Sequence, residues 1–448
     1  MALMAHDTTP LVLNVTRGEP ELVCPAEPTP RELKLLSDID DQEGLRFHMP
    51  GIMFYRADPS MEGNDPVKVV KDALARAKAL VFFYTYAGRL VEGPNRKLSV
   101  ECTGEGVPFI EAEADAMLED FGDEIHPPFP LEDLLYDIPG RNTNGMLGTP
   151  LVIVQVTRLR CRGFIVALPV NHVINDGSGI MQLMNAVGEI GRGFATPTIL
   201  PVWGRERLIA RESPKVTFPH PEYDQHEVID HHSNDQPELV QQSFLFGPTE
   251  LAALRHHVPP QTKQFSSFDI ICASLWRCRT IALKLDPGQE VRLLFAVNAR
   301  NKFNPPLAKG YYGNACAFPA VCAKAGDICN NKVGYILDLI RNTKNEVNEV
   351  YMRSIMDLMV TKDRPEFTVH QSYVVSDLRH LGFADVDFGW GKPVFGGPVS
   401  NGSVPDASFF ISFKNKKGET MIMVPISLPP SEMDVFVKEL QEMLQVHP

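Results

Sequence analysis

The chain has 448 residues, of which 44% are hydrophobic, 22% charged and 8% aromatic. This balance is typical of a folded globular protein of two or three domains and excludes disordered, collagen-like and coiled-coil classes. The 43 Lys and Arg residues against 56 Asp and Glu give a formal net charge of −13, and no dense basic stripe offsets it, so we expect no nucleic-acid partner.

The cysteine pattern and the lack of apolar runs indicate the compartment. The eight cysteines form no Cys-x-x-Cys pair and are too sparse for a disulfide framework, which favours a reduced, intracellular environment. The first residues lack the basic and apolar segments of a secretory signal, and no apolar run approaches the ~18 residues of a membrane span. We therefore expect a cytoplasmic protein without membrane contact.

The first clear helix signal lies at Asp65-Pro66, an N-cap followed by proline at the first helical position. Apolar residues then recur at helical spacing at Val67, Val70, Leu74 and Ala77. The aromatic segment 80–86 that follows is β-prone and closes at Gly88.

A hairpin and a helix are predicted next. Residues 151–159 and 164–170 are two strand-like runs separated by a short turn, and we expect the second to bulge or fray at Pro169, which cannot donate to a ladder. After the turn at residues 176–179, apolar residues at helical spacing predict a helix that ends near Gly191.

The polar, irregular stretch 211–242 is predicted to be a crossover linker between an N-terminal domain, 1–210, and a C-terminal domain, 243–448. In the second half, Ser266 and Asp269 form a capping box for a helix, and Ser431 is expected to cap the last helix with Asp434. The basic cluster around residues 414–417 is typical of a solvated hairpin turn. Strands and helices alternate in both halves, so we predict an α/β fold.

Several common active-site motifs are missing from the sequence. It contains no phosphate-binding P-loop, no Gly-x-Gly-x-x-Gly after a strand and no Gly-x-Ser-x-Gly elbow. The paired histidines have no acidic or thiolate neighbours at zinc-ligand spacing. We therefore predict no bound metal and no permanently bound cofactor.

His172 stands out because it follows a hydrophobic strand at a turn, where a side chain can project into a cleft while its backbone stays anchored. A neutral imidazole can take a proton from an alcohol near neutral pH. Asp176, four residues on, either orients this histidine or pairs with a distant cation, and we favour the pair because four residues in a turn rarely give triad geometry. Arg300, at the end of an apolar strand, is the candidate partner, although a solvated arginine fits equally well.

A third motif is Asp387-Phe-Gly-Trp390-Gly391, in which two glycines flank a tryptophan in a tight turn. Together with His172-x-x-x-Asp176-Gly177 and Tyr312-Gly313-Asn314, it resembles the signatures of the plant BAHD acyl-CoA-dependent acyltransferases. Further segments, at residues 36–40, 87–90, 102–106 and 200–203, follow in the order of that family. In finer texture the chain resembles the alcohol acyltransferase and benzyl alcohol O-benzoyltransferase branch.

The resemblance implies a monomer of two chloramphenicol-acetyltransferase-like domains, with mixed sheets flanked by helices and a solvent channel between the domains. His172 matches the general base and Asp176 matches the carboxylate that pairs with the arginine at Arg300. Gly177, Trp390 and Gly391 are implied to support the site. Asp387 belongs to a signature usually regarded as structural, although its aspartate is sometimes counted as catalytic, and on this resemblance we take Asp387 as a catalytic candidate beside His172.

The implied reaction moves an acyl group from acyl-CoA to the hydroxyl of a small alcohol, with Ser376 and Trp390 as candidates near the oxyanion. Candidates for binding the CoA co-substrate are Ser266, Ser267, Asp269, Lys302 and Lys309. Val173 and Ile174 depart from the branch's usual pattern beside the base, and we expect them to reshape the acceptor pocket. Acylation of an amine, acylation of an alkaloid hydroxyl and a non-catalytic binding protein remain alternatives.

Overall fold

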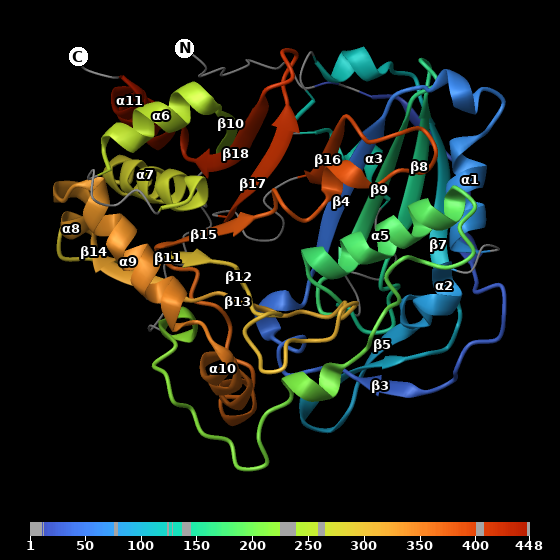
Figure 1. Cartoon of the computed structure of the whole chain (residues 1–448), viewed down its shortest axis with the longest axis horizontal. Helices are drawn as coiled ribbons and strands as arrows, with labels where there is room; N and C mark the ends of the chain where they lie inside the picture. Colours follow the sequence, from blue (N-terminus) through green and yellow to red (C-terminus); the bar gives the residue numbers. More distant parts are fainter. Residues whose placement is uncertain are drawn as a thin grey trace.

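The computed structural model describes residues 11–445, apart from 12, 76–78, 123–124, 128, 137–144, 225–238, 259–264 and 400–406. Two halves lie side by side, one coloured blue to green and the other yellow to red (Figure 1). Across these described ranges, no helix combines the length and the apolar character needed to cross a membrane.

The first half is built on a mixed sheet. Its strands in the described ranges are β1 (Val15–Arg17), β2 (Glu21–Val23), β4 (His48–Tyr55), β7 (Val107–Ala114), β8 (Val154–Leu159), β9 (Phe164–Asn171) and β16 (Phe395–Pro398). They follow the order β1-β7-β8-β9-β4-β16, with β2 added on β7. A smaller sheet contains β3 (Leu33–Leu35), β5 (Arg89–Glu92) and β6 (Leu98–Glu101).

The predicted hairpin is confirmed, since β8 and β9 pair antiparallel. The expectation that the second strand frays at Pro169 is wrong. The strand β9 continues to Asn171, with Pro169 directly opposite Pro50 of β4 and its carbonyl accepting the Ile153 amide. This continuity carries the strand up to the turn that holds His172.

Helices cover one face of this sheet. They are α1 (Pro66–Leu74), α2 (Ala79–Phe82) and α5 (Gly177–Gly191), and the short α3 (Leu131–Leu134) lies between β7 and β8 in the chain. The helix predicted after Asp65 is confirmed, with Asp65 as its N-cap, and Ala77 lies outside the described residues. The helix predicted after residues 176–179 is confirmed as α5.

The β-prone segment 80–86 is not a strand. It folds as α2 and a 3-10 helix at Tyr84–Ala87. Leu80, Phe83 and Tyr86 recur every three residues and are fully buried in the core under α1 and α5. Tertiary burial of one helical face therefore overrides the intrinsic β preference of these aromatic residues.

The second half has its own mixed sheet, in which β11 and β17 run parallel to β15. Its described strands are β10 (Val240–Phe246), β11 (Glu290–Phe295), β14 (Ala320–Lys324), β15 (Ser372–Asp377), β17 (Ala407–Lys414) and β18 (Thr420–Leu428). They follow the order β10-β18-β17-β15-β11-β14, and a separate ribbon pairs β12 (Val297–Asn298) with β13 (Cys316–Ala317). The predicted turn at residues 414–417 joins β17 to β18.

Helices of the second half pack mainly on one face of that sheet. They are α6 (Pro248–His256), α7 (Ser267–Ala282), α8 (Ala325–Asn330), α9 (Val333–Glu346), α10 (Glu349–Thr361) and α11 (Pro430–Leu444). The Ser266–Asp269 capping box of α7 is confirmed. The predicted cap at Ser431 is wrong, because α11 already begins at Pro430, and Ser431 lies inside the helix.

The two halves share a core and exchange a strand. The face of the first sheet opposite α1 and α5 packs against the second sheet, where Phe54 and Ile165 meet Phe409 and Met423. The strand β16 follows β15 in the chain but pairs with β4 of the first half. The division of the chain at 211–242 stays a prediction, and β16 is the strand that crosses it.

Candidate active site

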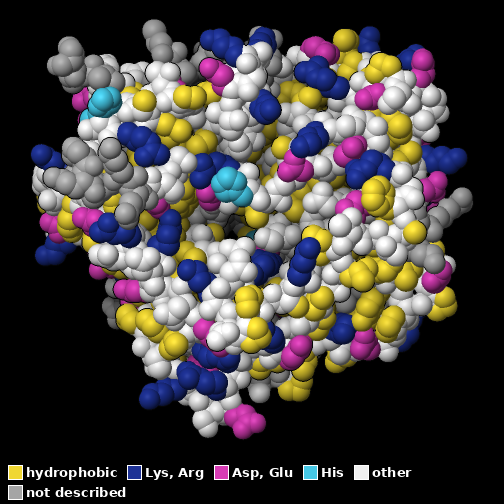
Figure 2. Space-filling model, viewed as in Figure 1, with side chains coloured by type: hydrophobic (Ala, Val, Ile, Leu, Met, Phe, Trp, Pro, Cys, Tyr) yellow, Lys and Arg dark blue, Asp and Glu magenta, His cyan; other side chains and the backbone are white. Residues whose placement is uncertain are grey.

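A cavity of about 170 Å³ lies where the two halves meet. Figure 2 shows this face of the molecule hollowed near its centre, with Lys and Arg side chains around the hollow. The cavity wall is mostly apolar, and it includes Met181 and Met184 of α5 and Phe409 of β17. The polar side chains of His172, Asn314 and Ser376 also line it. This combination of apolar walls and a few converging polar groups is typical of a small-molecule site.

His172 follows the last residue of β9, and three contacts fix its backbone and ring. Its amide donates to the carbonyl oxygen of Phe47 at 2.8 Å, and its carbonyl oxygen accepts from Nδ2 of Asn314 at 2.9 Å. The Phe47 ring lies 5.2 Å from the imidazole, centroid to centroid. The residue is therefore held by the first half on one side and the second half on the other.

The imidazole of His172 is surrounded by protein but reaches the cavity. Burial lowers its pKa, and this outweighs the nearby charge of Asp176, which raises it. The Nδ1 atom is buried, and its own carbonyl and Asn314 lie near it, but no described group makes a hydrogen bond of good geometry with it. A ring that is neutral near pH 7 and faces a cavity can accept a proton from a bound hydroxyl.

Asp176 caps α5 and pairs with Arg300. One carboxylate oxygen accepts the amides of Ser178 and Gly179. Both oxygens accept from Arg300, at 2.8 Å each, and Oδ2 also accepts the Ala315 amide. These bonds favour the ion pair over a triad role, because they occupy the carboxylate and none of the described contacts joins it to the imidazole.

The charges of this pair stabilise each other. Burial would raise the pKa of Asp176, but the charge and hydrogen bonds of Arg300 outweigh it and hold the pKa below the usual value. Burial would lower the pKa of Arg300, and Asp176 raises it instead. The pair thus joins the start of α5 in the first half to the β12–β13 ribbon of the second as two full charges.

Gly177 and Ser376 lie in the cavity wall, from opposite halves. A Cβ on Gly177 would come within 2.5 Å of Cδ1 of Leu381, so a larger residue here would require the Leu381 side chain to move. Ser376 is near the end of β15 and lines the cavity together with Asp377 and Leu378.

The Asp387 motif lies outside the cavity wall, near the C-terminal end of α5. The Asp387 carboxylate accepts the amides of Gly389 and Gly391, at 2.7 and 3.0 Å, and pairs with Arg192 just beyond the C-terminal end of α5. Trp390 packs edge-on against Phe164 with its ring centroid 5.1 Å away. Neither Asp387 nor Trp390 belongs to the described residues that line the cavity.

The CoA candidates fall into two groups. Ser266 and Asp269 are occupied by the α7 capping box, and Ser267 Oγ accepts from Arg379, which follows the cavity-lining end of β15. Lys302 and Lys309 are exposed on the loop between β12 and β13. That loop packs against Arg207 and α10, and no contact between described residues brings it to the start of α7.

The structure adds information on three residues near His172 in the fold or the chain: Val173, Ile174 and Asn314. Val173 and Ile174 are fully buried in the core of the first half and are not among the residues that line the cavity, and their expected effect on the acceptor pocket stays a prediction. Asn314, which the sequence shows only as part of a motif, donates to the carbonyl oxygen of His172. A bare sequence motif shows no contact partner, and no local pattern could have identified one.

The described residues contain no cluster of His, Cys, Asp or Glu side chains able to hold a metal ion. Each of the eight cysteines is free of disulfides.

The chain is similar in sequence to known acyltransferases over nearly its whole length. The model of the Transferase family matches residues 13–443. The chain is 56% identical over 447 residues to the benzyl alcohol O-benzoyltransferase of Petunia hybrida, covering 98% of this chain and 96% of that one. It is 50% identical over 448 residues to alcohol acyltransferase 16 of Actinidia chinensis var. chinensis, with 99% and 96% covered.

Solved structures share the fold. The crystal structure of vinorine synthase matches with a TM-score of 0.73 at 22% identity, covering 96% of this chain and 98% of that one. F. sporotrichioides TRI101, complexed with coenzyme A and T-2, matches with a TM-score of 0.70 at 17% identity, with 92% and 98% covered. The predicted α/β fold of two halves with mixed sheets is confirmed.

Proposed function

Since this chain belongs to the Transferase family, the BAHD acyltransferases, we propose that it transfers an acyl group from acyl-CoA to the hydroxyl of a small alcohol. The observation that carries the proposal is His172, an imidazole with a lowered pKa at an apolar cavity lined from both halves. The relatives with about half or more of their residues identical are named for transfer to alcohols, and they match over nearly the whole chain.

In the proposed reaction, His172 accepts the proton of the acceptor hydroxyl as its oxygen bonds to the thioester carbonyl carbon. The carbonyl oxygen gains the negative charge, and the Ser376 hydroxyl lines the same cavity as a candidate donor to it. The carbon–sulfur bond then breaks, and the CoA sulfur leaves as a thiol with the proton from His172. No covalent intermediate with the enzyme is needed.

Several residues hold the shape of the site without lining up with the reacting groups themselves. The Arg300–Asp176 pair holds the turn after His172, and Gly177 allows the close approach of Leu381. Asp387, Trp390 and Gly391 shape the loop against the far end of α5, about 22 Å from Asp176 by helical rise. We therefore assign Asp387 a structural role, although it was also a candidate for catalysis.

A second hollow of about 710 Å³ supports a place for the charged part of acyl-CoA. It shares Leu378 and Phe383 with the cavity of His172. Its lining includes five cationic residues, Arg56, Arg379, Lys392, Lys414 and Lys416, against two acidic ones, Glu119 and Asp385. Phosphate groups need such local cations on a protein of net charge −13.

This placement favours the start of α7 over the other candidate group. Arg379 joins the hollow to Ser267, whereas Lys302 and Lys309 lie on a different loop. Lys414→Glu should weaken CoA binding measured by calorimetry at least tenfold. Lys309→Glu, an exposed control with the same charge change, should leave it within twofold, and the reverse order would move the site to the β12–β13 loop.

The test of the reaction itself is a matrix of acetyl-, benzoyl-, anthraniloyl- and tigloyl-CoA against alcohols and matched amines, read by thiol release and mass spectrometry. We expect esters of alcohols. Amides would instead support N-acylation, and esters only with alkaloid hydroxyls would narrow the acceptor class. No thiol release with any pair would support a non-catalytic binding protein.

The matched variants are His172→Gln and His48→Gln. His48 lies on β4 opposite Asn171 but does not line the cavity. We expect the first to lose about 10²–10⁴-fold in kcat with CoA binding intact, and the second to keep turnover per folded molecule. We also propose a cytoplasmic location, supported by the eight free cysteines, and a monomer, which the family resemblance implies. Light scattering and fluorescent tagging test these two points.

A further inference from the structure

We infer that Asp40 is a positioning residue for His172. Resting on the function proposed above, the inference is that the buried carboxylate of Asp40 fixes the turn between β9 and α5 through two arms, Asn314 and Arg205. Asp40 does not line the cavity and so acts only through these neighbours.

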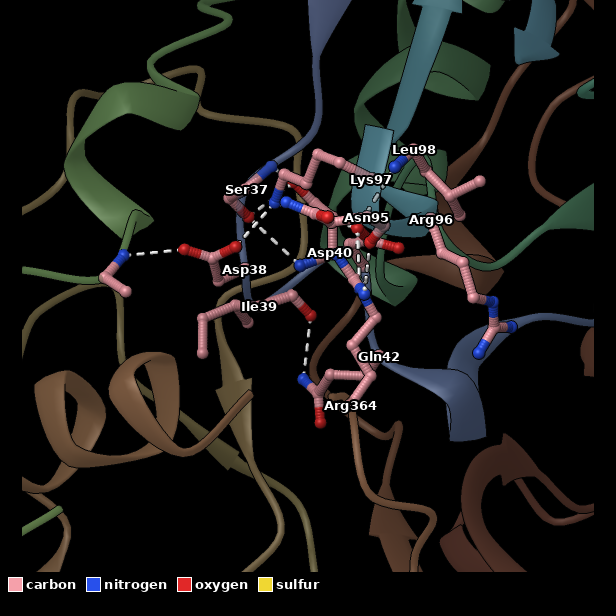
Figure 3. A network of polar contacts seen from close by, with 12 residues as sticks. Ser37, Asp38, Ile39, Asp40, Gln42, Asn95, Arg96, Lys97, Leu98 and Arg364 are labelled. Atoms are coloured by element: carbon pink, nitrogen blue, oxygen red, sulfur yellow. Dashed lines mark hydrogen bonds and ion pairs between the residues drawn. The ribbon is translucent and has the colours of Figure 1, made fainter. Parts of the chain in front are cut away.

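Asp40 lies in the segment Ser37–Gln42, which follows β3. Its side chain is fully buried. The amide and hydroxyl of Ser37 donate to Oδ2 at 3.1 and 2.6 Å, which locks the carboxylate in one orientation. Figure 3 shows this segment with Ser37 and Asp40 facing each other.

The first arm is Asn314, from the loop before β13. Its backbone amide and Nδ2 both donate to Oδ1 of Asp40, at 2.8 and 2.9 Å. The same Nδ2 also lies 2.9 Å from the carbonyl oxygen of His172. Asp40 therefore sets the orientation of the Asn314 side chain. Among the described contacts, this is the one side chain of the second half that bonds to the His172 backbone.

The second arm is Arg205. Its Nε donates to Oδ2 of Asp40 at 3.0 Å, and its Nη2 donates to the carbonyl oxygen of Ile174 at 2.6 Å. The guanidinium stacks near the rings of Trp203 and Tyr312, at 4.0 and 4.7 Å, and its side chain is 1% exposed. Asp40 is the carboxylate that forms its ion pair.

Both arms end on backbone carbonyls two residues apart, His172 and Ile174. A neutral side chain at position 40 would leave Arg205 as a buried, unpaired charge, and it would loosen both arms at once. Displacement of a catalytic group by about 1 Å costs up to about 10²-fold in rate, so a loose turn should lower kcat rather than substrate binding.

The same segment supplies a control. Asp41 is as buried as Asp40, but its carboxylate binds Arg46, Arg364 and the Leu98 amide. Asp38 binds Lys97 and the Ala210 amide. Figure 3 shows Lys97, Leu98 and Arg364 around this segment. Asp40→Asn and Asp41→Asn thus remove the same charge from two fully buried carboxylates that both pair with arginine.

The experiment compares Asp40→Asn, Asp41→Asn and His172→Gln in the full chain. The readouts are kcat, KM for acyl-CoA, the Kd for CoA by calorimetry and the unfolding midpoint. We expect Asp40→Asn to lower kcat per folded molecule 10- to 100-fold with KM and Kd within threefold. Asp41→Asn should keep kcat within threefold at a similar loss of stability.

Equal kcat for the two variants, or a loss confined to KM, would overturn the inference. If Asp40→Asn does not fold, Asn314→Ala replaces it, because this change removes the link to His172 and leaves the Asp40–Arg205 pair. The same fall in kcat is expected there, and unchanged kcat overturns the inference. An active His172→Gln variant would instead contradict the role of His172 as the base. The experiment therefore distinguishes a failure of the proposed function from a failure of the inference about Asp40.

Discussion

Arg300 closes on Asp176 with each of its two Nη atoms 2.8 Å from a carboxylate oxygen, and this fork joins the two halves beside His172. Removing one partner of a buried pair leaves an uncompensated charge. Arg300→Met should therefore lower the free energy of unfolding by about 3–5 kcal/mol. Arg300→Lys keeps the charge but not the fork and should lose less. Urea unfolding measures both, and an Arg300→Met variant as stable as the wild type would contradict the expectation.

The same pair predicts how stability depends on pH. Because the pKa of Asp176 is lowered in the folded state, its contribution is present above the unfolded carboxyl pKa of about 4 and is lost as the pH falls through the lower folded value. The stability difference between wild type and Asp176→Asn should be largest near pH 7 and shrink below about pH 4. Urea unfolding at several pH values measures it. A difference that grows on acidification would reverse the assigned sign.

Activity should persist on the acidic side of neutrality. Since burial lowers the pKa of His172, the acidic limb of the kcat/KM profile should lie below the ordinary histidine value of about 6.5. The charge of Asp176 raises this pKa, so Asp176→Asn should move the limb to still lower pH. Steady-state rates between pH 5 and 9 test both statements, on the condition that each variant is folded throughout. A limb above pH 7 would exclude the buried imidazole as the titrating group.

Two glycines of α5 should respond differently to alanine. A Cβ on Gly188 would come within 2.5 Å of the Asp387 carbonyl oxygen, whereas one on Gly191 would meet only ordinary contacts of 3.4 Å and more. Gly188→Ala should cost about 1–3 kcal/mol by overpacking, while Gly191→Ala should be neutral or slightly stabilising at the helix end. Thermal and urea unfolding of the two variants provide the comparison. Equal effects would mean that the loop at Asp387 shifts freely.

Asp387→Asn separates a structural role from a catalytic one. The carboxylate holds the amides of Gly389 and Gly391, which have φ values of +113° and +76°, and it lies outside the cavity. We expect a loss of stability of about 1–2 kcal/mol with kcat per folded molecule within threefold of wild type. Activity must be normalised to the folded fraction measured on the same sample. A hundredfold fall in kcat in a fully folded Asp387→Asn variant would show that Asp387 is a catalytic residue.

Local signals in the sequence were sufficient for the elements that carry the candidate base. Two strand-like runs separated by a short turn in residues 151–170 predicted the β8–β9 hairpin, and apolar spacing after Asp176 predicted α5. These features depend on neighbours within a few residues, so periodicity and caps describe them well. The structure also places Arg300 on Asp176, as the family resemblance implied.

Features that depend on distant contacts were not predictable in this way. The helix at residues 79–82 forms because Leu80, Phe83 and Tyr86 enter a shared core, and this burial is invisible in a β-prone window. The orientation of Val173 and Ile174 into that core follows from the path of the turn. The Asp40 arms join segments near residues 40, 205 and 314, and no local pattern links them.

The pairing of β16 with β4 means that one edge of β4 stays uncovered during most of the chain's synthesis. Strand β4 ends at Tyr55, and its edge partner begins at Phe395, so most of the chain must be synthesised before that edge is covered. Until then β4 offers unpaired backbone groups to other nascent chains. Fragments that end before β16 should therefore associate, and the enzyme should depend on chaperones that shield this edge during translation.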